Sequence, residues 1–180
     1  MTDQDPIPFS RRFAWDRVQP RGTPVSIEAT PAECKAIADA LGILKVANAS
    51  AEFLVTPFRK TGFKVTGEVR AEVEQACVVS LEPVPESISE TVDLRFLPES
   101  EIEPVDEEIE VDIDAEDPPE PIVGAFVDLG VLATEFIAVG LDPYPRSPGA
   151  EFTPLIEDDG SEDEAESPFA GLSALKDKQP

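Results

Sequence analysis

Hydrophobic and polar residues alternate along residues 63–73 (FKVTGEVRAEV), the most regular pattern in the chain. A period of two is typical of a strand that buries one face, as in an antiparallel sheet. Residues 51–57 and 88–96 carry shorter versions of the pattern, and the letters TGFK are typical of a hairpin turn between the first two stretches. The chain therefore predicts an antiparallel meander of three consecutive strands.

Prolines set the expected limits of these strands. Pro57 is expected to end the first strand, and Pro83 and Pro85 are expected to break the chain before the third, because proline cannot donate to a sheet ladder. Hydrophobic residues also alternate over 109–113, inside a strongly acidic stretch. That stretch is either a solvated loop or a short acidic edge strand.

The clearest helix signal is TPAECKAIADALG, which starts at Thr30. Thr30 suits the N-cap, Pro31 suits the first helical position, and Glu33 completes a capping box. Gly42 is a typical stop. Four residues share one face at helical spacing and are expected in the core: Cys34, Ile37, Ala38 and Leu41.

A second helix is predicted within VDLGVLATEFIAVGL, with Asp128 as its N-cap. Its inner stripe is almost entirely apolar, and LDPYPRSPG, with three prolines, ends it. Together these patterns predict an α+β fold, in which an antiparallel β-sheet packs against two main α-helices.

Charge divides the chain into two unequal parts. Residues 1–75 hold ten basic and ten acidic residues, whereas residues 76–180 hold 4 basic and 28 acidic ones, so the later part carries the whole net charge of −24. Twelve of the acids lie in 99–120, where no basic residue occurs. Such self-repelling stretches are typical of solvated loops or disorder.

These shifts in composition suggest a domain organisation. We expect a flexible N-terminus over 1–8, one α+β domain over 9–155 with an acidic insert at 99–120, a disordered acidic linker over 156–167, and a short helical segment over 168–180. In that last segment Phe169, Leu172 and Leu175 would share a face, which could dock on its own domain or on a partner.

The chain offers little for catalysis. It has no histidine and only two cysteines, Cys34 and Cys77. A nucleophilic Cys77 would lack a base, and a zinc site would lack ligands, so both thiols are expected to pack inside. We expect no cofactor, no metal and no small-molecule substrate. An enzyme would need a base that the sequence does not show, so a non-enzymatic protein is expected. No signal peptide or membrane-spanning run is recognisable, so a cytoplasmic location is expected.

Basic and aromatic residues interleave near the N-terminus: Arg11, Arg12, Phe13, Trp15 and Arg17. Such a segment can contact phosphates and stack on bases of RNA. It can also be structural, with Phe13 and Trp15 pinning the segment to the sheet. The 28 acids of the later part would oppose RNA and favour a basic protein.

Several stretches, including ACVVSLEPVP and DLGVLATEFIAVGLDPYPRSPG, closely resemble the YceD family of large ribosomal RNA subunit accumulation proteins, and most of all its alphaproteobacterial members. The resemblance covers about residues 9–176. Many members carry a second cysteine shortly after the first, where this chain has Val78, Val79 and Ser80. The residues matched to family motifs are Cys77, Leu81, Glu82, Pro83, Asp128, Leu129, Gly130, Glu135, Leu141, Asp142, Pro143, Tyr144, Pro145 and Arg146.

The resemblance implies a non-enzymatic role in accumulation of large-subunit ribosomal RNA, that is, in ribosome assembly. The charge suggests that the acidic part binds a basic ribosomal protein. The alternative is direct binding of ribosomal RNA through the N-terminal arginines and aromatics. The proline-locked DPYPR stretch either presents Tyr144 and Arg146 to a partner with little entropy to lose or only reverses the chain.

Overall fold

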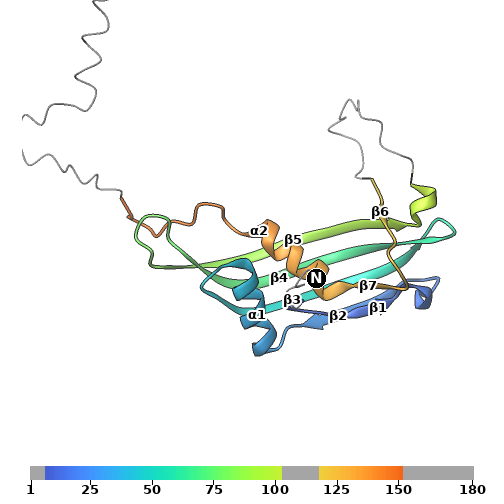
Figure 1. Cartoon of the computed structure of the whole chain (residues 1–180), viewed down its shortest axis with the longest axis horizontal. Coiled ribbons are helices and arrows are strands. Elements are labelled where there is room, and N and C mark those ends of the chain that lie inside the picture. Colours follow the sequence, from blue (N-terminus) through green and yellow to red (C-terminus); the bar gives the residue numbers. More distant parts are fainter. Residues whose placement is uncertain (1–6, 103–117, 152–180) are drawn as a thin grey trace, which may run out of the picture. The chain divides into compact units, whose positions relative to one another are not determined.

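The computed structural model describes residues 7–102 and 118–151 and is built on a five-stranded sheet (Figure 1). The strand order is β2-β3-β4-β5-β6, antiparallel except for the parallel β5–β6 pair. The strands span Thr23–Glu28 (β2), Lys45–Phe58 (β3), Gly62–Ala76 (β4), Pro83–Leu97 (β5) and Glu120–Pro121 (β6).

A second, two-stranded sheet joins two segments that lie far apart in the sequence. β1 (Arg12–Ala14) pairs antiparallel with β7 (Phe126–Asp128). The helices are α1 (Pro31–Leu41) and α2 (Leu129–Gly140), with short 3-10 turns η1 (Trp15–Arg17) and η2 (Glu99–Glu101). The α+β class and the two main helices agree with the expectation from sequence.

One face of the large sheet forms the core, together with both helices. The side chains of Val55, Val65 and Val69 are 0% exposed, and they belong to the same buried cluster as Ile37 of α1 and Ile137 of α2. The side chains at alternate positions point to the opposite face, which is mostly polar and is half-buried or exposed. The alternation in the sequence therefore predicts correctly which side chains are buried.

Both helices begin where the sequence predicts. The Thr30 side chain accepts from the Glu33 backbone N–H, and the Glu33 carboxylate accepts from the Thr30 N–H, which completes the capping box. Gly42 ends α1 in the left-handed conformation, with φ of +66°. Asp128 caps α2 by accepting from two N–H groups of its first turn.

The prolines were wrongly expected to limit the strands. Pro57 lies inside β3, opposite Phe63, and Pro83 and Pro85 lie inside β5. β5 pairs only with β4 along the stretch that holds its two prolines, so their missing N–H groups leave no ladder bond unmade. The strands are consequently longer than the sequence suggests.

Some expectations fall outside the described residues. These are the first six residues of the flexible start expected over 1–8, the acidic strand at 109–113, the linker at 156–167, and the segment that holds Phe169, Leu172 and Leu175. The part of the chain that the structure describes contains no helix long and apolar enough to cross a membrane.

Candidate functional site

Asp128 connects the N-terminal segment to α2. Its Oδ1 accepts from the backbone N–H of Arg11 at 2.7 Å and from those of Gly130 and Val131 at 3.1 and 3.3 Å, and Oδ2 accepts from the Ser10 hydroxyl. Burial acts to raise the pKa of this carboxyl, but the four hydrogen bonds outweigh it, and the pKa is lowered. One carboxylate thus holds two distant segments together.

Gly130 allows the same two segments to approach closely. A Cβ at this position would lie 2.7 Å from the Phe9 carbonyl oxygen and 3.0 Å from the Arg11 nitrogen. Phe9 itself is 1% exposed. The DLG motif therefore has a structural explanation: the aspartate binds the N-terminal segment, the leucine is buried, and the glycine leaves room for the backbone.

The basic and aromatic residues near the N-terminus, which were candidates for RNA binding, divide into two groups. Arg11 forms a double hydrogen bond with Glu33, at 2.6 and 2.9 Å, and this lowers the pKa of Glu33 to about 2. Phe13 lies half-buried in β1, and Trp15 stacks on Phe63 with ring centroids 6.2 Å apart. These three hold the segment against the domain. The side chains of Arg12 and Arg17 are exposed.

Cys77 directly follows β4, at the start of the tight turn between β4 and β5. Its sulfur accepts from the backbone N–H groups of Val79, Ser80 and Ser147 at 3.5, 3.4 and 3.3 Å. These hydrogen bonds, led by that from Ser147, lower the pKa of the thiol to about 6. The residue is 0% exposed, which confirms the predicted buried cysteine.

The turn at Cys77 packs against the DPYPR stretch, although the two lie far apart in sequence. The Val78 N–H donates to the Pro145 carbonyl at 2.9 Å, and the Gln75 side chain donates to the Asp142 carbonyl at 3.0 Å. The Asp142 carboxylate in turn accepts from the Tyr144 N–H at 2.8 Å. The turn over 77–82 and the DPYPR stretch over 142–146, both matched to the family, therefore hold each other in place, and we call them together the braced turn.

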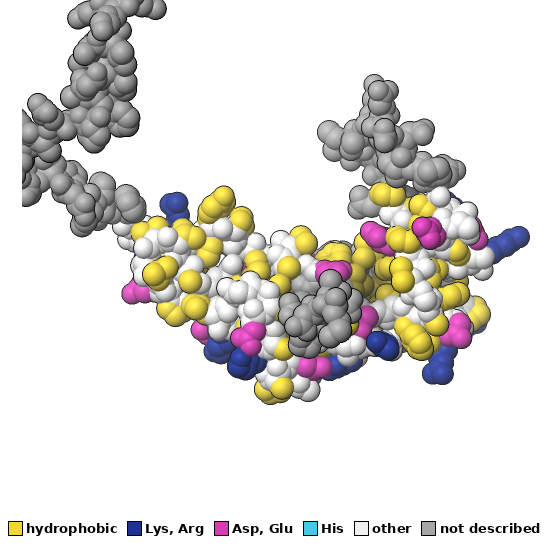
Figure 2. Space-filling model, viewed as in Figure 1, with side chains coloured by type: hydrophobic (Ala, Val, Ile, Leu, Met, Phe, Trp, Pro, Cys, Tyr) yellow, Lys and Arg dark blue, Asp and Glu magenta, His cyan; other side chains and the backbone are white. Residues whose placement is uncertain are grey.

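This braced turn presents apolar side chains to solvent. Leu81 is 76% exposed and has a positive φ of 63°, a conformation that leucine rarely adopts. Tyr144 is 72% exposed, Val78 is 47% exposed, and Arg146 is exposed. In Figure 2, hydrophobic side chains gather over this end of the domain and again near the opposite end, towards β6.

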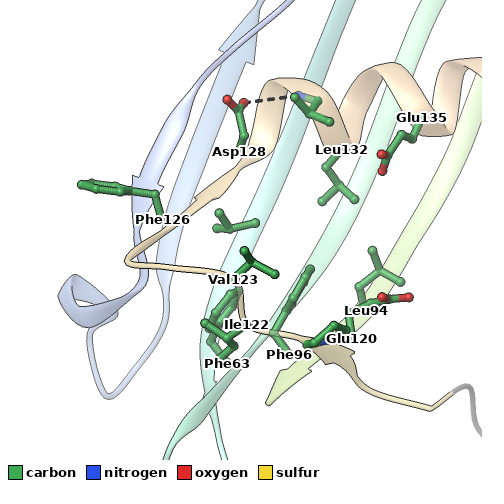
Figure 3. Close-up of a pocket in the computed structure, with 13 residues that line it drawn as sticks. Phe63, Leu94, Phe96, Glu120, Ile122, Val123, Phe126, Asp128, Leu132 and Glu135 are labelled. Carbon is green, nitrogen blue, oxygen red and sulfur yellow. Dashed lines mark hydrogen bonds between the residues drawn. The ribbon is translucent and has the colours of Figure 1, made fainter. Parts of the chain in front are cut away.

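A pocket of about 460 Å³ lies between α2, β7, β6 and the ends of β4 and β5 (Figure 3). Phe63 and Phe96 form its base as a stacked pair, with ring centroids 4.7 Å apart and planes 12° from parallel. Leu132 points into the pocket from α2, whereas the Phe126 side chain points away from it. Val123, which is 82% exposed, lines one wall.

The charge in this pocket has one sign. Its 13 lining residues include three acids, Glu120, Asp128 and Glu135, and no lysine or arginine. Asp128 is engaged with the N-terminal segment. Within the described residues, the side-chain carboxylates of Glu120 and Glu135 neither accept a hydrogen bond nor form an ion pair. Two uncompensated carboxylates therefore border an aromatic base.

The structure groups the family-matched residues at two places. Cys77, Leu81 and Pro145 belong to the braced turn, and Asp128 and Glu135 border the pocket. The sequence did not indicate Glu120 or Val123 as site residues. Alternation predicted correctly that Phe63 and Phe96 face inward, but no local signal indicates that the 120–126 stretch crosses their edge.

Neither place has the donor set of a metal centre. In residues 7–102 and 118–151, no group of three or more cysteine, aspartate or glutamate side chains is arranged to hold a metal ion. The pocket instead has an apolar lining with two free carboxylates at its border. Such a site is suited to a group that has a cationic head and an apolar body.

Comparison with known proteins identifies one family. A family model described as "Large ribosomal RNA subunit accumulation protein YceD" matches residues 65–176, which is more than half of the chain. No match was found among curated proteins or solved structures.

Proposed function

The chain belongs to the YceD family of large ribosomal RNA subunit accumulation proteins, and from this premise we propose that it supports accumulation of that RNA by binding a basic protein of the large ribosomal subunit. In this proposal it acts in the cytoplasm as a binding protein and not as an enzyme. A protein that binds ribosomal RNA carries clustered lysine and arginine, and such a cluster is complementary in charge to an acidic protein surface.

The observation that carries the proposal is how few ion pairs the described acids of residues 76–180 form. Among the described residues there are five ion pairs, and four of them take their acid from residues 1–75. The described part of residues 76–180 holds eleven acids, and Asp93 is the one that takes part in these five ion pairs. Uncompensated carboxylates attract a basic partner over distances near the Debye length, about 8 Å at physiological salt.

Direct RNA binding through the N-terminal segment has less support. Arg11 is hydrogen-bonded to Glu33, and Trp15 is stacked on Phe63 with its indole N–H donating to the Gly124 carbonyl. A base could stack on Trp15 only if the ring left the domain. Arg12 and Arg17 are the exposed cations that remain in this segment.

Neutralising the acidic insert tests the proposal. Replacing the acidic residues of 99–117 by their amides is expected to weaken binding of a basic large-subunit protein by at least about tenfold and to flatten its salt dependence. Binding is measured by titration calorimetry at two salt concentrations.

The matched control reverses charge at the other end of the chain. The Arg12→Glu, Arg17→Glu double variant spares the Arg11–Glu33 pair, so the fold is retained, and affinity for the basic protein should stay within about twofold. If this variant loses binding while the neutralised insert keeps it, the acidic surface is not the binding surface.

A further inference from the structure

The pocket bordered by Glu120 and Glu135 combines two features that suit one kind of side chain. Its base is the stacked Phe63–Phe96 pair, and its walls are aliphatic, including Leu132. An aromatic face attracts a cation that lies over it, and apolar walls accept the methylene stem of lysine or arginine. The two free carboxylates can then bind the charged head group.

The sequence that precedes Glu120 is strongly acidic. The chain leaves the described residues at Ile102 and returns at Pro118, two positions before Glu120. The fifteen residues between them carry nine acids and no base. An RNA phosphate would be repelled here, so the charge favours a cationic protein segment over nucleic acid.

We propose that this pocket binds an arginine or lysine side chain, together with an adjacent apolar side chain, from a basic ribosomal protein. The volume of about 460 Å³ exceeds what one side chain needs and falls within the usual range for ligand pockets. Arginine is also one of the residues that contribute most to protein interfaces. The inference rests on the proposed function and assigns its central contact.

The chain contains its own reporter for this pocket. Trp15 is its single tryptophan, and its ring stacks on Phe63, which is part of the pocket base. Phe63 is 2% exposed and also stacks on the half-buried Phe96, so a side chain placed over Phe96 changes the surroundings of that stack. Intrinsic fluorescence therefore measures occupancy of the pocket in the full chain without an added label.

The probe is a blocked peptide of sequence GSLRLSG, compared with GSLELSG, spermidine and a large-subunit RNA fragment. We expect a saturable change in Trp15 fluorescence with the arginine peptide and none with the glutamate peptide, because only the first supplies a cation beside leucine. Saturation by spermidine at equal or lower concentration would overturn the proposal, since that ligand has no apolar side chain. Displacement of the peptide by RNA would also overturn it.

Two variants remove the site without touching the core. Glu120→Gln with Glu135→Gln keeps the shape and removes the charge, and Val123→Arg adds an internal cation at an 82% exposed position. Each is expected to weaken peptide binding by about tenfold or more. The controls make the same charge changes elsewhere: Glu28→Gln with Glu52→Gln on the exposed sheet face, and Val139→Arg at a 77% exposed position of α2.

The same variants separate this inference from the proposed function. If the unchanged protein binds a basic ribosomal protein and both pocket variants bind it equally well, the pocket assignment is wrong and the proposed function stands. If the unchanged protein binds no basic ribosomal protein, the proposed function fails. A third variant is truncated after residue 167. If it binds the peptide more than tenfold more tightly than the full chain does, the C-terminal segment is the natural occupant of the pocket, and the proposal is overturned.

Discussion

Replacing Asp128 with alanine is expected to lower the free energy of unfolding by about 3 kcal/mol. The change removes the N-cap of α2 and also the acceptor for the Ser10 hydroxyl and the Arg11 N–H. A cap alone contributes about 1 kcal/mol, and the hydrogen bonds to a charged acceptor account for the rest. Urea unfolding followed by circular dichroism measures the total.

Thr30→Ala is the matched control, because Thr30 caps α1 and accepts only within its own helix end. It should cost about 1 kcal/mol. Hydrogen exchange provides a second readout: in the Asp128 variant the amides of residues 9–14 should exchange faster, while in the Thr30 variant they should not. Equal costs for the two variants, with unchanged exchange at 9–14, would show that Asp128 does not anchor the N-terminal segment.

Replacing Cys77 with alanine is expected to lower the melting temperature by roughly 5–10 °C. The substitution leaves a small void and removes the acceptor for three backbone N–H groups, one of which belongs to Ser147 of the DPYPR stretch. Buried donors without an acceptor are costly. Differential scanning calorimetry measures the shift.

The pH dependence of this effect follows from the lowered pKa. The Cys77 thiol has a pKa of about 6 in the folded chain and an ordinary value near 9.0 when unfolded. Between these values the unfolded state binds more protons, so the stabilisation grows as pH rises from 6 to 9 and is lost as pH falls through 6. The absence of histidine leaves few other groups that titrate in this window.

Cys34→Ala is the control for Cys77. Burial raises the pKa of Cys34, so its thiol stays protonated across the same range and its removal should cost stability equally at pH 6 and pH 8. For Cys77→Ala the loss should be clearly larger at pH 8 than at pH 6. A pH-independent loss at Cys77 would mean that its sulfur is not held as a thiolate by the turn.

Local signals explain which parts of the fold the sequence predicts. The capping box of Thr30 and Glu33 and the left-handed Gly42 act within a few residues of each other, so α1 can be recognised from its own letters. The β1–β7 pair cannot be recognised in this way. Arg11 and Asp128 lie 117 positions apart, and strands of three residues are too short to show alternation.

The proline error has a similar origin. Whether a proline interrupts a strand depends on whether a neighbour needs its N–H, and that depends on the strand order. Pro83 and Pro85 are tolerated because β5 lies at an edge of the sheet along this stretch. The pocket is also a product of topology, because Phe63, Glu120 and Glu135 come from three separate elements.

The central claim is that the acidic part of the chain binds a basic protein of the large ribosomal subunit. The most direct measurement is a titration of the purified full chain, at physiological salt, with individual basic large-subunit proteins and separately with large-subunit RNA fragments. We predict saturable binding to at least one such protein and none to RNA. Saturable RNA binding that persists at this salt concentration, without binding to any of the proteins, would contradict the account.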